Sequence, residues 1–201
     1  MRRTARDKLL DAALGLVREK GYAAMTVDEL CARAEVTKGA FFHHFASKEA
    51  LGVAVAEHWS AVTSDLFEQA PYHAPEDPLA RVLAYVDFRR ELLRGEVPEF
   101  TCVVGTMVQE VFDTNPAIRE ACAASIFGHA HTLEPDIQAA MDAHGIRGPW
   151  TAASLARHTQ AVLQGAFILA KAHGDASVAV ESAEHLRHYI ELLFRRPETS
   201  A

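Results

Sequence analysis

The sequence predicts an all-α protein with two helical domains, a small one over residues 1–50 and a larger one over residues 51–201. Apolar residues recur three and four positions apart through almost the whole chain, which is the period of one face of an α-helix. No segment sustains the alternation of apolar and polar residues that is typical of a strand. The 11 glycines and eight prolines fall mostly between the periodic segments, where helices begin and end.

Composition excludes several classes of protein. With 201 residues, 49% of them hydrophobic, the chain can bury substantial cores. No run of about 18 apolar residues is present, so no membrane-spanning helix is predicted. The N-terminal segment lacks a credible signal-peptide cleavage site, and we expect a cytoplasmic protein. Three widely spaced cysteines argue against a disulfide scaffold.

The first three predicted helices are short and closely spaced. One spans about Thr4 to Lys20 and ends at Gly21, a usual residue after a helix. A second runs from Thr26 to near Glu35, because Thr26 and Glu29 form a capping box. Thr37 caps the third helix, Lys38 to Phe45, and Ser47 caps the next. Helix, short turn and helix is the arrangement that lays a second helix in the major groove of DNA.

The third helix has side chains suited to nucleic acid. Phe41 and Phe45 lie four apart and are expected to be buried on one face. The opposite face then presents a cation, an aromatic ring and two imidazoles: Lys38, Phe42, His43 and His44. The first turn, Thr37 to Ala40, contains the small residues Gly39 and Ala40 and has free backbone N–H groups, so it can approach bases and phosphates closely. A surface helix with a stray aromatic is the alternative, and the complete arrangement favours DNA.

The same residues resemble the TetR/AcrR family of bacterial transcriptional regulators. The resemblance covers about the first quarter of the chain, including Gly21-Tyr22, and rests on four segments: TVDEL (26–30), AEVTKGA (34–40), FHHF (42–45) and SKEAL (47–51). It implies a helix-turn-helix DNA-binding domain over residues 1–50 and a ligand-binding and dimerisation domain over residues 51–201.

The resemblance also implies roles for individual residues. Phosphate contacts would match Thr26, Thr37 and Lys48, and the base-reading face would match Lys38, Gly39, Ala40 and His43. Family members usually carry tyrosine where this chain has Phe42. The hydroxyl contact to phosphate is therefore missing here, although the ring can still pack on a sugar.

Charge is divided unevenly along the chain. Residues 1–50 hold nine Lys/Arg and seven Asp/Glu, a net +2, whereas the remainder holds 11 and 20, a net −9. Arg2, Arg3, Arg6 and Lys8 concentrate positive charge in the first eight positions, where an arm can follow phosphates or simply solubilise the terminus. The acidic remainder is expected to stay off the DNA.

The larger domain is predicted to be helical throughout. A long helix runs from Lys48 to about Gln69, and others cover about 79–93, Cys102–Phe112 and the segment opened by Asn115-Pro116. The last two helices, about 151–173 and 177–195, carry more apolar surface than one core needs. Two helices from each of two chains can form an isologous four-helix interface, which the family resemblance implies as well. We therefore expect a homodimer.

The central helices are expected to enclose a pocket for a small, mostly apolar effector. The candidate effector-binding residues are Trp59, Phe88, Cys102, Met107, Phe112, Phe127, His129 and Phe167. Taken singly, each is more often a core residue than a ligand contact.

Cys102 is the one chemically unusual residue. It stands at a predicted helix start, where the dipole lowers a thiol pKa, and Lys171 is a candidate neighbour. The run Cys102-Val-Val-Gly resembles a stretch in one branch of the family, some of whose members sense electrophiles. A small thiol used for packing is the favoured alternative, as it is for Cys31 and Cys122.

No other chemistry is indicated. The spacings His129-x-His131 and His185-x-x-His188 lack a nearby cysteine or carboxylate in a ligand pattern, so no metal is predicted. No nucleophile elbow, P-loop or dinucleotide loop is present, and no cofactor or enzymatic activity is expected.

We conclude from the sequence that the chain is a ligand-responsive transcriptional regulator, most simply a repressor, whose partners are a double-stranded DNA operator, a small-molecule effector and a second copy of itself. A thiol-based sensor of electrophiles or oxidants through Cys102 is an alternative on the same scaffold. A helical enzyme that uses Cys102 or a histidine, and a helical module that binds protein rather than DNA, are the alternatives from other classes.

Overall fold

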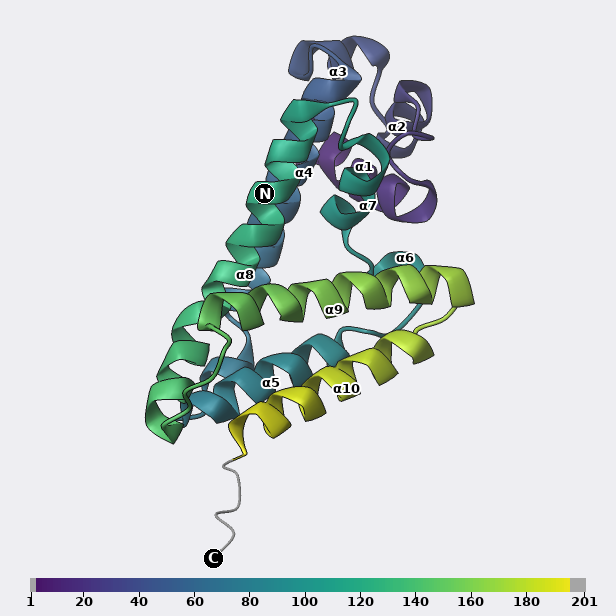
Figure 1. Cartoon of the computed structure of the whole chain (residues 1–201). Coiled ribbons are helices and arrows are strands. Elements are labelled where there is room, and N and C mark those ends of the chain that lie inside the picture. The colour runs from purple at the N-terminus through teal and green to yellow at the C-terminus, as the bar shows by residue number, and fades with distance from the viewer. Residues whose placement is uncertain (1–2, 196–201) are drawn as a thin grey trace, which may run out of the picture. The chain divides into compact units, whose positions relative to one another are not determined.

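The computed structural model describes residues 3–195, and every regular element in that range is helical (Figure 1). The elements are α1 (Ala5–Lys20), α2 (Val27–Ala34), α3 (Lys38–His44), α4 (Lys48–Glu68), η1 (Pro71–His73), α5 (Pro78–Glu91), α6 (Val97–Phe100), α7 (Val103–Val111), α8 (Pro116–His144), α9 (Ala152–His173) and α10 (Ser177–Phe194). The all-α prediction is confirmed.

Packing divides the chain into two compact units. The first consists of Met1–Glu68 and Thr101–Ile126, and the second of Gln69–Phe100 and Phe127–Ala201. Two helices from the middle of the chain, α7 and the first part of α8, are thus packed with the N-terminal helices. This division differs from the predicted functional boundary at residue 50, which stays a prediction.

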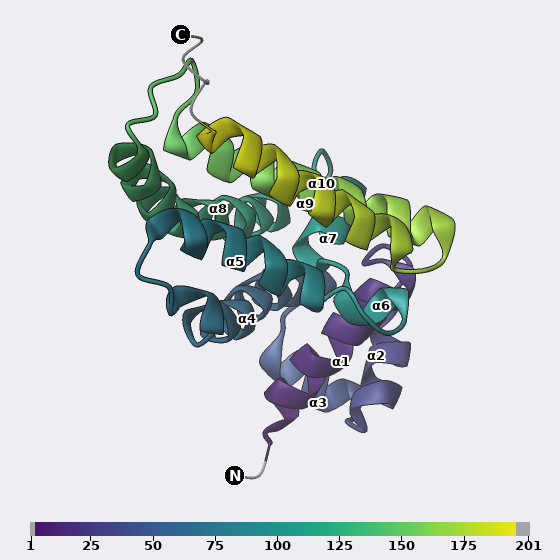
Figure 2. The same cartoon turned by 90° about the horizontal axis from the view of Figure 1, so that it is seen from below.

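The first unit is built around α1, which packs against α2, α3, α4 and α7. Leu9 of α1, Leu30 of α2, Phe41 of α3, Val55 of α4 and Met107 of α7 are all fully buried in one shared core. Figures 1 and 2 both show α1, α2 and α3 gathered together. Helices α2 and α3 are therefore held by a core to which α7, from the middle of the chain, contributes.

The second unit is formed by η1, α5, α6, the later part of α8, α9 and α10. Helix α10 lies along both α9 and α5, as Figure 2 shows. Val82 of α5, Ile137 of α8, Leu163 of α9 and Ile190 of α10 are nearly or completely buried in its core. Each of them belongs to a set of apolar residues at helical spacing within its own helix, which is why the helices were predictable.

The helix boundaries follow the predicted caps closely. Thr26 and Thr37 each accept the backbone N–H three residues on, and Ser47 does the same for Ala50. Asn115, which precedes Pro116 at the start of α8, accepts the N–H of Ile118 through its side chain. Gly21 ends α1 with φ +88°, a value that favours glycine. The short elements η1 and α6 were not predicted, because each is only one turn long beside a proline.

Gly52 marks the closest approach between α4 and its neighbours in the first unit. A Cβ atom at this position would lie 2.5 Å from Ile118 Cδ1 and 3.0 Å from Tyr22 Cε2. Ile118 is fully buried and Tyr22 nearly so, and neither can move without disturbing the core.

We predict that Gly52→Ala lowers the free energy of unfolding by about 1–3 kcal/mol, because overpacking outweighs the gain in helix propensity. Urea unfolding measures the change. Gly128→Ala is the matched control: it is also within a helix, but nothing lies within 4 Å of its added Cβ. It should stabilise by about 0.5–1 kcal/mol. Equal effects at the two positions would contradict the packing argument.

Candidate nucleic-acid interface

Helices α2 and α3 form a helix-turn-helix with a turn fixed by backbone hydrogen bonds. The N–H of Glu35 donates to Ala32 O at 3.2 Å, and the N–H of Val36 donates to Cys31 O at 3.0 Å. Glu35 takes the left-handed conformation, φ 54° and ψ 46°, at a cost of about 1–2 kcal/mol for a residue with a side chain. The turn is therefore imposed by the packing of the two helices rather than by a glycine.

Helix α3 is divided into a buried face and an exposed face. Phe41 is fully buried, Phe45 is 4% exposed, and their ring centroids lie 5.8 Å apart. Lys38, Phe42, His43 and His44 are all exposed, with Phe42 at 57%. The predicted division of α3 is confirmed, and the exposed residues form one surface that carries cationic, aromatic and imidazole groups.

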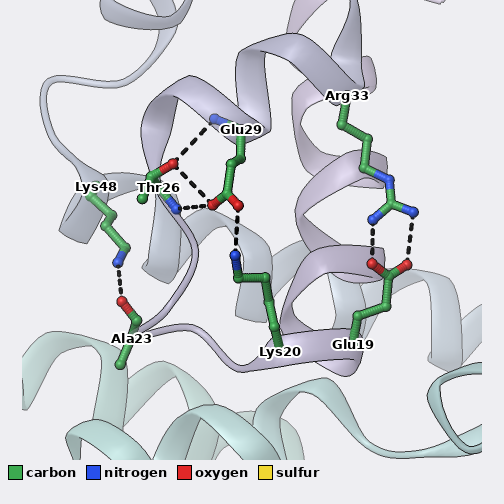
Figure 3. Close-up of polar contacts among 7 residues, drawn as sticks. All are labelled: Glu19, Lys20, Ala23, Thr26, Glu29, Arg33 and Lys48. Atoms are coloured by element: carbon green, nitrogen blue, oxygen red, sulfur yellow. Dashed lines mark hydrogen bonds and ion pairs between the residues drawn. The ribbon is translucent and has the colours of Figure 1, made fainter.

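Thr26 and Glu29 close the predicted capping box at the start of α2 (Figure 3). Thr26 Oγ1 accepts the N–H of Glu29 at 3.2 Å, and Glu29 Oε2 accepts the N–H of Thr26 at 3.1 Å. Lys20 Nζ donates to the other carboxylate oxygen at 2.6 Å. The Lys20 hydrogen bond, with those from Thr26, lowers the pKa of Glu29 to about 2. The start of α2 is thereby tied to the end of α1.

Several basic side chains in this unit have intramolecular partners. Arg3 pairs with Asp11 at 2.9 Å, Lys38 Nζ lies 2.6 Å from Asp28 Oδ1, and Arg33 is held by both oxygens of Glu19 (Figure 3). The Asp28 carboxylate raises the pKa of Lys38, which is charged at neutral pH. Any contact of Lys38 with phosphate or a base must therefore replace the contact with Asp28.

Lys48, at the start of α4, has a different environment. Its Nζ donates to Ala23 O at 3.0 Å and lies 4.7 Å from the centroid of the Tyr22 ring, while the Tyr22 hydroxyl donates to Lys48 O at 2.9 Å. Burial lowers the pKa of Lys48. These contacts fix the lysine against the loop between α1 and α2.

Two of the four basic residues near the N-terminus lie within a helix rather than in an extended arm. Arg6 and Lys8 belong to the first turns of α1, and Arg6 lies over the Phe45 ring at 5.7 Å. Arg2 lies outside the described residues.

Two family models match this chain. "Bacterial regulatory proteins, tetR family" matches residues 9–55, and "Tetracyclin repressor-like, C-terminal domain" matches residues 78–186, more than half of the chain. The chain belongs to the TetR family of bacterial transcriptional regulators. It is therefore a transcriptional regulator of a helix-turn-helix family, and not a member of an enzyme family.

Individual relatives agree with the TetR assignment. The chain is 33% identical over 107 residues to the transcriptional regulator AcuR of Cereibacter sphaeroides, a stretch that covers 53% of this chain and 49% of that one. It is 44% identical over 64 residues to the repressor NemR of Escherichia coli K12, covering 31% and 32% of the two chains. The chain thus spans about half the length, or less, of these two relatives in sequence.

Solved structures are similar over nearly the whole chain. The reduced form of E. coli NemR superposes with a TM-score of 0.78 at 26% identity, over 98% of this chain and 100% of that one. A TetR regulator from Chloroflexus aurantiacus gives a TM-score of 0.80 at 26% identity, over 93% and 94%. TetR-family membership implies an operator-binding N-terminal part and a C-terminal ligand and dimerisation part.

The candidate effector residues divide between the two units. In the first unit, Met107 is fully buried in the core, Trp59 is partly buried under the Arg18 guanidinium, and Phe112 is 59% exposed. Cys102 caps α7, with its Sγ accepting the N–H of Gly105 at 3.4 Å. The predicted position of Cys102 at a helix start is confirmed. Lys171 belongs to the second unit, and its proximity to Cys102 stays a prediction.

In the second unit, His129 belongs to a buried polar network that the sequence did not reveal. Its Nε2 lies 2.9 Å from the hydroxyl of Tyr85, which also accepts hydrogen bonds from Arg89 at 3.3 Å and Gln160 at 3.2 Å. Because the Tyr85 oxygen accepts from two donors, its own hydrogen is directed to His129 Nε2. Burial and the Arg89 charge lower the pKa of His129 to about 3, so the ring is neutral.

The aromatic candidates of the second unit are placed differently from one another. Phe167 is 6% exposed, packs near Phe100 and lies 5.9 Å from the Arg89 guanidinium. Phe88 is partly buried beside Tyr72, with the ring centroids 5.8 Å apart. Phe127 is 59% exposed. Phe167 and His129 are therefore connected through Arg89, whereas Phe127 is not part of this cluster.

Within residues 3–195, no group of three metal-binding side chains is assembled. None of the helices in that range is long and apolar enough to span a membrane.

The Lys38–Asp28 pair generates a prediction about DNA affinity. Asp28→Asn removes a negative charge beside α3 and releases Lys38, so affinity for any duplex should rise severalfold. A log–log salt slope steeper by ~0.9 would place the released Lys38 on a phosphate rather than on a base edge. Fluorescence anisotropy across a salt series measures both. Glu57→Gln, at an exposed position on α4, controls for the change in net charge. An unchanged salt slope in Asp28→Asn would show that Lys38 meets no phosphate.

Proposed function

We propose that this protein is a ligand-responsive repressor that binds a pseudo-palindromic operator as a homodimer and is released by a small, mostly apolar effector. The observation that carries the proposal is the exposed face of α3, where Lys38, Phe42 and His43 project from a helix whose other face is buried. Such a helix can enter the major groove without disturbing the core. Because its target is DNA, we place the protein in the bacterial cytoplasm.

Repression is the form of regulation that relatives support. E. coli NemR, which is similar to this chain in sequence and over its full length in structure, is named a transcriptional repressor. The simplest mechanism is occlusion of a promoter by the bound dimer, with an effector favouring a conformation in which the two reader helices no longer match successive grooves.

The homodimer is proposed to form through helices 151–173 and 177–195. In α9, Ile168 and Leu169 are 48% and 54% exposed, and in α10, Tyr189 and Leu192 are 42% and 47% exposed. Large apolar side chains at this level of exposure on two adjacent helices favour association with a second copy. Gly165 has nothing within 4 Å of an added Cβ, which leaves room for a close helix contact.

The effector is proposed to contact the second unit near His129. Phe167, Phe88 and the aliphatic core supply apolar surface there, and the Tyr85–His129–Gln160 network supplies hydrogen-bonding groups. His129 is neutral, so it can exchange its bond with Tyr85 for one with a ligand at no cost in charge.

The DNA-binding roles are separable by mutation. Lys48→Ala should weaken binding by a similar factor on all sequences and reduce the salt slope by ~0.9, because a phosphate contact carries no sequence information. His43→Ala should change which bases are preferred. Titration of fixed duplexes over a salt series measures the loss of affinity, and binding-site selection from a random duplex library measures the base preference. Two chains are expected per site. A shift in preference for Lys48→Ala, with none for His43→Ala, would reverse the assignments.

The alternative that a specific observation favours is a thiol sensor. Cys102 is partly exposed at the N-terminus of α7, and the similar E. coli NemR structure is described as a reduced form. Cys31 and Cys122 are buried, and burial raises the pKa of both thiols, that of Cys122 to about 12. Both are therefore protonated at neutral pH, which leaves Cys102 as the reactive thiol in the alternative.

Under that alternative, native protein treated with N-ethylmaleimide should gain one adduct, on Cys102, and lose DNA affinity as the added bulk displaces α7. Mass spectrometry locates the adduct and fluorescence anisotropy follows the binding. Cys102→Ser should bind DNA as wild type does and resist the reagent. Equal loss in both proteins would eliminate the thiol sensor and leave the reversible effector as the proposed signal.

A further inference from the structure

The loop between α1 and α2 receives a carboxylate from a distant part of the chain. Glu110, in the last turn of α7, accepts the N–H of Ala23 through Oε2 at 2.8 Å, across 87 positions of sequence. Both residues belong to the first unit. Water could satisfy a backbone N–H in an exposed loop, so the hydrogen bond is not needed to pair this group. Its effect is to fix the position of the loop relative to α7.

Gly21 provides the space that the carboxylate occupies. A Cβ atom built on Gly21 would lie 2.0 Å from Glu110 Oε1 and 3.0 Å from Glu110 Cδ. Gly21 is buried and adopts φ +88°, so a side chain is disfavoured there on both grounds. The end of α1 and the carboxylate of α7 therefore fit together at one place.

The same peptide segment holds Lys48. Ala23 donates its N–H to Glu110 and accepts a hydrogen bond on its carbonyl oxygen from Lys48 Nζ at 3.0 Å. Tyr22, the preceding residue, contacts Lys48 through both its ring and its hydroxyl. Glu110 also interacts electrostatically with Lys48. The carboxylate thus fixes the short segment against which the lysine is aligned.

We propose that Glu110 is a positioning residue for DNA binding, which holds the α1–α2 loop so that Lys48 is presented to the phosphate backbone. The inference rests on the proposed phosphate role of Lys48 and extends it to a residue far outside the helix-turn-helix. It also connects α7 directly to the α1–α2 loop inside the first unit, because α7, which Cys102 caps, carries this carboxylate in its last turn.

The direction of the change in DNA affinity distinguishes a positioning role of Glu110 from an effect of net charge. Removal of a negative charge from a DNA-binding unit should by itself strengthen binding. Loss of the loop contact should weaken it, because Lys48 then samples orientations away from the phosphate. Asp113, an exposed carboxylate in the turn after α7, is the matched control, since Asp113→Ala removes the same charge close by.

The test measures DNA affinity over a salt series for wild type, Glu110→Ala, Glu110→Gln and Asp113→Ala. Glu110→Ala should bind about fivefold to tenfold more weakly and lose ~0.9 of salt slope, whereas Asp113→Ala should bind as tightly as wild type or more tightly. Glu110→Gln should recover most of the affinity, because its amide oxygen can still accept the Ala23 N–H. Circular dichroism and thermal unfolding establish that each variant is folded.

A double-variant cycle completes the test. If Glu110 acts through Lys48, the combination of Glu110→Ala with Lys48→Ala should bind no more weakly than Lys48→Ala alone. Additive losses, or a Glu110→Ala protein that binds like Asp113→Ala, would overturn the inference while leaving the repressor proposal intact. A Lys48→Ala protein with an unchanged salt slope would overturn both the role of Lys48 and this inference. Failure of wild type to bind any duplex in a salt-dependent manner would overturn the proposed function itself.

Discussion

The burial of Phe41 and Phe45 is the interaction on which α3, the proposed DNA-reading helix, depends. Helix α3 has seven residues, too few for a helix to be stable in water by propensity alone. Both rings are inserted into the core beneath α3, and Phe41 is fully buried. This anchoring leaves Lys38, Phe42 and His43 exposed on a rigid face, and it lets Glu35 take a left-handed conformation that the residue would otherwise avoid.

In the first unit, several basic side chains form ion pairs with carboxylates of the same chain. Lys38 is paired with Asp28, Arg33 with Glu19, and Lys20 with Glu29. Exposed pairs of this kind contribute about 0–1 kcal/mol each to stability, so exchange for phosphate is inexpensive. Among these cations, Lys38 belongs to the proposed base-reading face, so a duplex gains from Lys38 only where it supplies a contact that replaces Asp28.

Local features were predictable from the sequence, and contacts between distant residues were not. Thr26, Thr37 and Gly21 fix helix ends through atoms only a few positions away, and the spacing of Phe41 and Phe45 alone indicates which face of α3 is buried. The bond of Glu110 to Ala23 and the contact of Tyr85 with His129 join residues 87 and 44 positions apart. Their partners depend on how helices pack, and a carboxylate in a polar helix end has no local pattern that singles it out.

The packing of α7 into the first unit has a consequence for how signals can reach the reader. Met107 is buried in the same core as Phe41, while Cys102 and Glu110 stand at the two ends of this nine-residue helix. Protein cores are close-packed, so a helix of this length moves as a rigid body rather than deforming. If Glu110 aligns Lys48 as proposed, a displacement at the Cys102 end of α7 is transmitted to Glu110 and so to the α1–α2 loop. In this proposal α7 is connected to the α1–α2 loop by a contact that lies wholly within the first unit.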